Sequence, residues 1–212
     1  MSRKIINQSQ LDELVFLFNK RDFQKLLAKA RPLLKINKKS SFLNRIIGAT
    51  EAELGQYDNA IICFKRLIQI DAKSDEPYLL IGNVMVAKGR TQDAIKNFRI
   101  AFELNKDSFL AAHNLGCQLL EAQRPREAIE VLRIAVNLQP QNVPANLNFG
   151  IALFRSGDLN EAEALLLKLT SANPQLFEAN LNLGLIKLEM GEYNHAIEMF
   201  KKAEKINPIQ SD

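Results

Sequence analysis

The sequence predicts an all-α solenoid made of six antiparallel helical hairpins. Three observations predict it: a glycine recurs every 34 residues, an alanine recurs with the same period, and apolar residues within each period have helical spacing. Internal repeats of roughly 20 to 50 residues are typical of solenoids, propellers and arrays. No stretch has the alternation of a half-buried strand, so we expect helices only.

The recurring glycines and alanines define the repeats. The glycines are Gly48, Gly82, Gly116, Gly150 and Gly184, and the alanines are Ala60, Ala94, Ala128, Ala162 and Ala196. When the glycine is counted as position 8 of its repeat, five repeats cover residues 41–74, 75–108, 109–142, 143–176 and 177–210. A divergent first repeat fits residues 7–40, where Leu14 and Leu26 replace the small pair. We therefore expect one array within residues 1–212, and we number positions 1 to 34 in each repeat.

Each repeat is predicted to hold a first helix, a turn at position 15 and a second helix. In four repeats position 15 is glycine, and in the fourth repeat it is Gln123. Glycine suits a helix end that needs a left-handed backbone conformation. Pro125 falls in the first turn of a second helix, where proline is tolerated, whereas Pro32 falls inside one and should kink or end it.

Position 8 lies inside the first helix, where glycine costs about 1 kcal/mol relative to alanine. Five repeats carry this cost, so we expect the second helix to approach closely there. The small alanine at position 20 is the expected partner across the hairpin.

The repeat resembles the tetratricopeptide repeat, TPR. The matching features are the 34-residue length, glycine at position 8, alanine at position 20, an aromatic residue or leucine at position 24 and, in the last three repeats, proline at position 32. The family's tryptophan at position 4 is missing from every repeat. The resemblance implies a right-handed superhelix whose first helices line a concave groove.

Three consecutive repeats present asparagine at position 6, namely Asn114, Asn148 and Asn182, each within the phrase A-x-x-N-L/F-G. A helical wheel places positions 2, 5, 6, 9 and 13 opposite the packed face, so these side chains should point to the groove. The phrase is similar to the TPR arm of O-linked N-acetylglucosamine transferase and of related bacterial proteins. That resemblance implies that the asparagines bind the backbone of an extended peptide.

Apolar side chains share the face that the wheel places in water. They lie at positions 5 and 9 of the last two repeats and are Leu147, Ile151, Leu181 and Leu185. His113 occupies position 5 of the fourth repeat. A peptide, a second copy, a downstream domain or tighter packing between hairpins would each cover this face. The alternative is that the asparagines are neutral helix residues and that the aliphatic side chains belong to the core.

Charge is distributed unevenly along the chain. Residues 1–45 contain 11 Lys or Arg and 3 Asp or Glu, whereas the whole chain has a net charge of +4. An acidic protein or an anionic membrane would be attracted to this basic hairpin. The simpler interpretation is the solvated outer face of a capping repeat, which solenoids need. Because stacking aromatics and nucleic-acid motifs are missing, we expect no nucleic-acid partner.

The sequence offers little for catalysis. It has two histidines and the two cysteines Cys63 and Cys117, with no metal-ligand spacing and no glycine-rich phosphate loop. His113 and Cys117 could form a Cys–His pair, but no orienting acid accompanies them. We expect no enzyme activity, no cofactor and no metal. No apolar run is long enough to span a membrane and no signal peptide is recognisable, so we expect a cytoplasmic protein.

The leading hypothesis is a non-catalytic adaptor or scaffold that binds a protein or an extended peptide in the concave groove. One alternative is the N-terminal substrate-presenting arm of a larger enzyme, of glycosyltransferase or sulfotransferase type, with catalysis outside this chain. Another is a self-assembling scaffold, that is, a homo-oligomer formed through the uncovered leucine and isoleucine surface.

Overall fold

The computed structural model describes residues 6–208, which form twelve α-helices and no strand. The all-α prediction is therefore confirmed for the described part of the chain. The helices are α1 (Gln8–Asn19), α2 (Phe23–Ile36), α3 (Ser41–Glu53), α4 (Tyr57–Ile70), α5 (Glu76–Ala87), α6 (Thr91–Leu104), α7 (Phe109–Glu121), α8 (Pro125–Leu138), α9 (Val143–Ser156), α10 (Leu159–Ala172), α11 (Phe177–Glu189) and α12 (Tyr193–Ile206). The ends of the predicted array, including the last two residues of the sixth repeat, lie outside the described residues.

The helices follow the 34-residue period closely. Every second helix begins at position 17 and ends at position 30 of its repeat, and the divergent first repeat obeys the same rule. The first helices begin at position 1 or 2 and end at position 13 or 14. Pro32 lies inside α2, which continues to Ile36, so of the two expected outcomes, a kink or an end, the proline does not end the helix.

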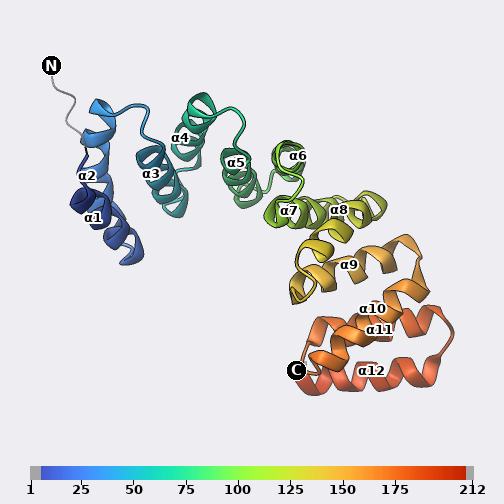
Figure 1. Cartoon of the computed structure of the whole chain (residues 1–212). Coiled ribbons are helices and arrows are strands. Elements are labelled where there is room, and N and C mark those ends of the chain that lie inside the picture. Colours follow the sequence, from blue (N-terminus) through green and yellow to red (C-terminus); the bar gives the residue numbers. More distant parts are fainter. Residues whose placement is uncertain (1–5, 209–212) are drawn as a thin grey trace. The chain divides into compact units, whose positions relative to one another are not determined.

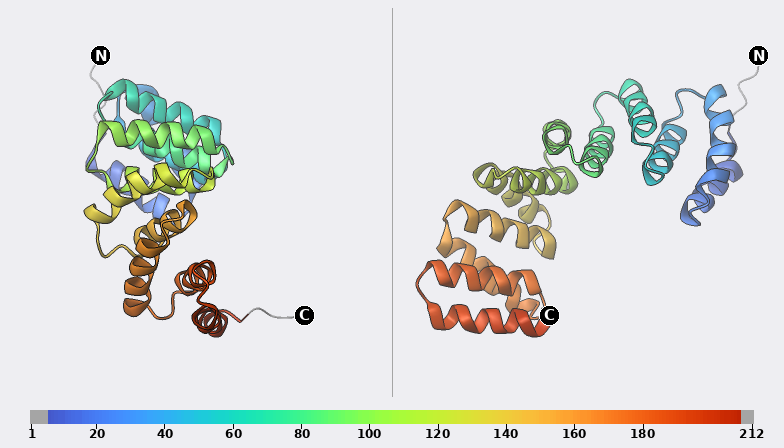
Figure 2. Two further views of the ribbon diagram at one scale, coloured as in Figure 1. Left: turned by 90° about the vertical axis from the view of Figure 1, so that its right-hand side faces the viewer. Right: turned by 180° about the vertical axis from the view of Figure 1, so that it is seen from behind.

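The chain divides into two compact halves, one with α1–α6 and one with α7–α12. Within each half the two helices of a hairpin pack side by side, as Figures 1 and 2 show. The second helix of a hairpin also packs on the first helix of the next, as α2 does on α3 and α8 on α9. Within each half, each hairpin thus contributes to a core that continues into its neighbour, as in other repeat proteins.

The turns inside the hairpins have the predicted left-handed backbone. Gly55, Gly89, Gly157 and Gly191 have φ angles of 72°, 68°, 91° and 76°. The same turn is made by Gln123, with a φ of 56°, and by Arg21 of the first repeat, with a φ of 57°. Two repeats therefore adopt this conformation without the residue that adopts it most easily.

The position 8 glycines make a close approach to the second helix, but the expected partner is wrong. A Cβ atom on Gly116 would lie 2.4 Å from Cγ of Leu132, and one on Gly82 would lie 2.4 Å from Cε1 of Phe98. In all five repeats the nearest atoms belong to the side chain at position 24, sixteen residues after the glycine. The position 20 alanines are buried in the same hairpins but are not the groups that fill this space.

The first repeat exchanges the sizes of this pair. Its position 8 is Leu14 and its position 24 is Ala30, and both are buried, with 1% and 0% of their surface exposed. Large and small residues thus change places between the two helices. Cores tolerate such exchanges when the total volume is kept.

We predict that Gly116→Leu destabilises the protein by about 1–3 kcal/mol, because the added side chain overlaps Leu132. The double variant Gly116→Leu/Leu132→Ala reproduces the arrangement of the first repeat and should recover part of that loss. Thermal unfolding of the wild type, both single variants and the double variant gives the coupling between the two sites.

Leu132→Ala alone should also lower the melting temperature, because it leaves a cavity. If the losses of the two single variants simply add in the double variant, positions 8 and 24 do not share one packing space.

Candidate functional site

The predicted groove residues lie on α7, α9 and α11 of the C-terminal half. All of them are half-buried in the structure: Asn114, Asn148, Asn182, His113, Leu147, Ile151, Leu181 and Leu185. The first helices of successive hairpins contact one another there, α7 with α9 and α9 with α11. This packing removes part of the face from solvent while leaving each side chain accessible.

Asn148 is hydrogen-bonded to the preceding hairpin. Its Nδ2 donates to Sγ of Cys117 at 3.2 Å and lies 3.3 Å from Nε2 of His113. Sγ of Cys117 is 3.6 Å from the same Nε2. The structure therefore brings together three polar side chains. Asn148, at position 6 of the fifth repeat, contacts His113 and Cys117, at positions 5 and 9 of the fourth.

Asn182 occupies the same position one repeat later but makes a different bond. Its Nδ2 donates to the backbone carbonyl of Glu178 at 2.7 Å, one turn earlier in its own helix. The residues that correspond to His113 and Cys117 are here Leu147 and Ile151, which carry no hydrogen-bonding group. An amide donor without a partner in the neighbouring hairpin is satisfied within its own helix.

The Cys–His–Asn group does not have the electrostatics of a nucleophile. Burial raises the pKa of the Cys117 thiol to about 11, and burial lowers the pKa of the His113 imidazole. Both groups are therefore neutral near pH 7, whereas a catalytic cysteine needs a thiolate. The His113 ring also stacks on Phe109, with ring centroids 5.4 Å apart, which fixes its orientation.

A second set of asparagines, at position 4, was missed by the sequence analysis. Asn180 is 3% exposed, and its Nδ2 donates to the carbonyls of Pro174 and Leu176 at 3.2 and 2.8 Å. Asn44 and Asn146 make the same pair of bonds to the carbonyls six and four residues before them. These asparagines join the loops before α3, α9 and α11 to those helices. The sequence does contain a sign of this second set, because α9 and α11 both carry the phrase Asn-x-Asn. The first amide of the phrase is buried and the second is half-buried.

Position 11 carries a charged residue in two repeats, and both are paired within the chain. Glu51 is 2% exposed and accepts a hydrogen bond of 2.6 Å from Arg31. Lys187 forms ion pairs with Glu163 at 2.5 Å and with Glu192 at 2.6 Å. Both residues therefore serve packing between helices. Within residues 6–208 no group of three or more His, Cys, Asp or Glu side chains gathers in a way that suits a metal ion.

We predict that Asn180→Ala lowers the free energy of unfolding by about 1–3 kcal/mol, because two loop carbonyls lose their buried donor. Asn182→Ala, two residues later in α11, should change it by less than about 0.5 kcal/mol, because its bond is to a carbonyl of its own helix. Urea denaturation of the two variants makes the comparison. Equal losses would contradict the assignment of position 4 to structure and position 6 to the surface.

We predict that Cys117 alkylates slowly at neutral pH. With a pKa of about 11, its reaction with iodoacetamide should accelerate about tenfold per pH unit from pH 7 until the pH approaches that value. A Cys63→Ser variant leaves Cys117 as the reacting cysteine. Free cysteine, whose alkylation rate levels off above its own pKa, is the control. A plateau near pH 7 would indicate a thiolate–imidazolium pair instead.

No helix within the described residues is both long and apolar enough to cross a membrane. No curated protein matches the sequence. Among solved structures, YrrB, described as a TPR protein with an unusual peptide-binding site, is 23% identical, covers 85% of this chain and 93% of its own, and has a TM-score of 0.77. MamA from Desulfovibrio magneticus RS-1 is 22% identical, with a TM-score of 0.74 and coverage of 81% and 97%. Another MamA structure is 26% identical, with a TM-score of 0.70 and coverage of 76% and 94%.

Four family models match the sequence, all described as tetratricopeptide or TPR repeats. They match residues 48–89, 79–143, 119–183 and 177–210, and so together span the second to sixth repeats from the position 8 glycine of the second. The solved structures show the same fold. The chain belongs to the tetratricopeptide repeat family.

Proposed function

We propose that this chain is a non-catalytic adaptor that binds an extended segment of a partner protein along α7, α9 and α11. The observation that carries the proposal is the register of asparagines at position 6 beside half-buried aliphatic side chains at positions 5 and 9. The TPR fold and its neighbours support a protein-interaction module in general. The peptide-binding site named for YrrB favours a peptide as the ligand.

The hydrogen bonds within the chain define how the asparagines contact a peptide. Nδ2 of Asn148 and Nδ2 of Asn182 are both engaged by the protein itself. An amide nitrogen carries two N–H groups, and Asn182 uses only one of them on Glu178. The Oδ1 atoms of both amides and the second N–H of Asn182 are therefore left to bond the backbone of a ligand. A backbone contact of this kind is independent of the ligand's side chains.

The aliphatic side chains supply the larger part of the binding energy. Each hydrogen bond to the peptide contributes about 0.5–1.5 kcal/mol, whereas association costs about 4–15 kcal/mol. Leu147, Ile151, Leu181 and Leu185 lose their remaining exposure when a segment covers them. Leu110, 57% exposed at position 2 of the fourth repeat, adds an apolar side chain on α7. Burial contributes about 25 cal/mol for each Å² of apolar surface.

The chemistry of the polar groups supports binding rather than catalysis. The Cys117 thiol and the His113 imidazole are both neutral near pH 7. Both groups contact Asn148 and each other rather than an acid, and both lie on a regular helix without a backbone oxyanion site. In this proposal their role is to hold Asn148 in place.

We predict that replacing Asn114, Asn148 and Asn182 together by alanine weakens peptide binding at least about tenfold, because up to three backbone hydrogen bonds are lost. Peptides selected from a random displayed library on the wild-type chain provide the ligands, and calorimetry gives their affinities for both proteins.

The matched control replaces Asn137, Asn160 and Asn194 by alanine. These asparagines are exposed on the second helices α8, α10 and α12 and lie away from the candidate site. The control should bind like the wild type. If the two triple variants bind the selected peptides equally well, the asparagines at position 6 are not the binding surface.

A further inference from the structure

A hollow of about 560 Å³ lies at the other end of the chain, where α2 ends and the loop to α3 begins. Seven residues line it: Ile6, Lys35, Ile36, Asn37, Lys38, Lys39 and Ser40. We call it the lysine pocket. It belongs to the N-terminal half, whereas the proposed groove belongs to the C-terminal half.

The three lysines carry charge that the protein does not neutralise. Three other basic residues of this hairpin are paired, Arg21 with Glu53, Lys29 with Glu13 and Arg31 with Glu51. Lys35, Lys38 and Lys39 are exposed, and none forms an ion pair with a described residue. From residue 23 to residue 50 the sequence contains no Asp or Glu at all. The positive potential around the pocket is therefore open to an external anion.

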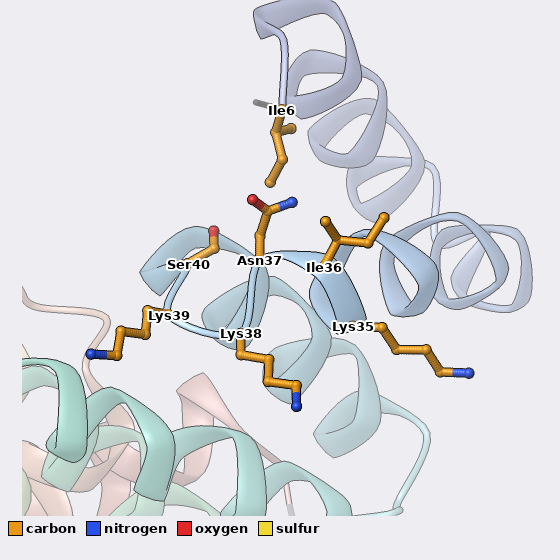
Figure 3. A pocket seen from close by; sticks show the side chains of 7 residues that line it. All are labelled: Ile6, Lys35, Ile36, Asn37, Lys38, Lys39 and Ser40. Carbon is orange, nitrogen blue, oxygen red and sulfur yellow. The ribbon is translucent and has the colours of Figure 1, made fainter. Parts of the chain in front are cut away.

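The pocket also has an apolar part. Ile36 is 57% exposed and Ile6 is half-buried, and Figure 3 shows both beside Asn37. The side-chain Nδ2 of Asn37 donates to the carbonyl of Leu33 at 3.2 Å, which leaves its Oδ1 able to accept a hydrogen bond from a ligand. A ligand that fits has an aliphatic group for the two isoleucines and a backbone N–H for the amide.

The directions of the lysines indicate which anion fits. In Figure 3 the side chains of Lys35, Lys38 and Lys39 extend away from the pocket in different directions. They do not converge on one point, as a site for a single phosphate would require. A row of carboxylates spaced along a peptide matches charges that are spread in this way. A flat bilayer is a poorer fit, because part of the apolar surface, Ile6, is half-buried within the hollow.

We propose that the lysine pocket is a second binding site, which takes an acidic segment of a partner protein with one aliphatic side chain. The aliphatic group packs against Ile6 and Ile36, and flanking carboxylates pair with Lys35, Lys38 and Lys39. Such exposed pairs are individually weak, so affinity depends on several acting together and falls as salt is raised.

The test uses the full chain and a fluorescein-labelled peptide, Gly-Glu-Glu-Asp-Leu-Glu-Asp-Glu-Gly, with fluorescence anisotropy as the measurement. Replacing Lys35, Lys38 and Lys39 by glutamine should weaken binding at least tenfold. The matched control replaces Lys65, Lys73 and Lys168 by glutamine; these lysines are exposed elsewhere, and the net charge changes equally. The control should stay within twofold of the wild type. Equal losses in the two triple variants would overturn the proposal, because they would show only a general effect of charge.

The apolar contact has its own variant. Ile36→Ser should weaken binding of the leucine peptide severalfold and leave binding of the same peptide with alanine in place of leucine unchanged. An equal loss for both peptides would contradict the pocket. Binding to phosphatidylserine vesicles without binding to the acidic peptide would overturn the proposal in favour of a membrane surface. The triple alanine variant at position 6 should bind the acidic peptide normally, so failure of one site is distinguishable from failure of the other.

Discussion

The contact between position 8 and position 24 sets the distance between the two helices of each hairpin, and the other features follow from that distance. Where the first helix carries glycine, the second carries a large side chain that fills the space of the missing methyl group. In the first repeat the sizes are reversed, with the large Leu14 on the first helix and the small Ala30 on the second, and both are buried. Because this packing recurs from hairpin to hairpin, the first helices α7, α9 and α11 present the same repeat positions on one face.

The period and the helical spacing were enough to predict the hairpins, because both are properties of the residues along the chain. The partner of each glycine was not predicted correctly, because a helical wheel shows which residues share a face but not how far a side chain reaches across to the next helix. Alanine at position 20 is buried, but it is not the residue that fills the space beside the glycine. The turn at Gln123 was predicted only because the period placed it in line with four glycines.

The candidate site was predicted in part. The sequence placed the asparagines of position 6 on one face, but the wheel of an isolated helix contains no neighbouring helix, and so it overestimated their exposure. The wheel also did not distinguish Asn148, whose amide bonds to Cys117, from Asn182, whose amide bonds to its own helix. That difference arises from the side chains of the preceding repeat, polar before Asn148 and aliphatic before Asn182. Identical residues at one repeat position thus have different donors available to a ligand.

The buried asparagines at position 4 have a consequence for the length of the chain between hairpins. Each of Asn44, Asn146 and Asn180 holds carbonyls four and six residues before it, on the connection from the preceding second helix. One inserted or deleted residue in that connection would separate the amide from at least one of its acceptors and leave a buried polar group without a partner. The loops before α3, α9 and α11 are therefore constrained in length. In this way a pair of local hydrogen bonds at each of these three loops opposes a slip in the 34-residue spacing.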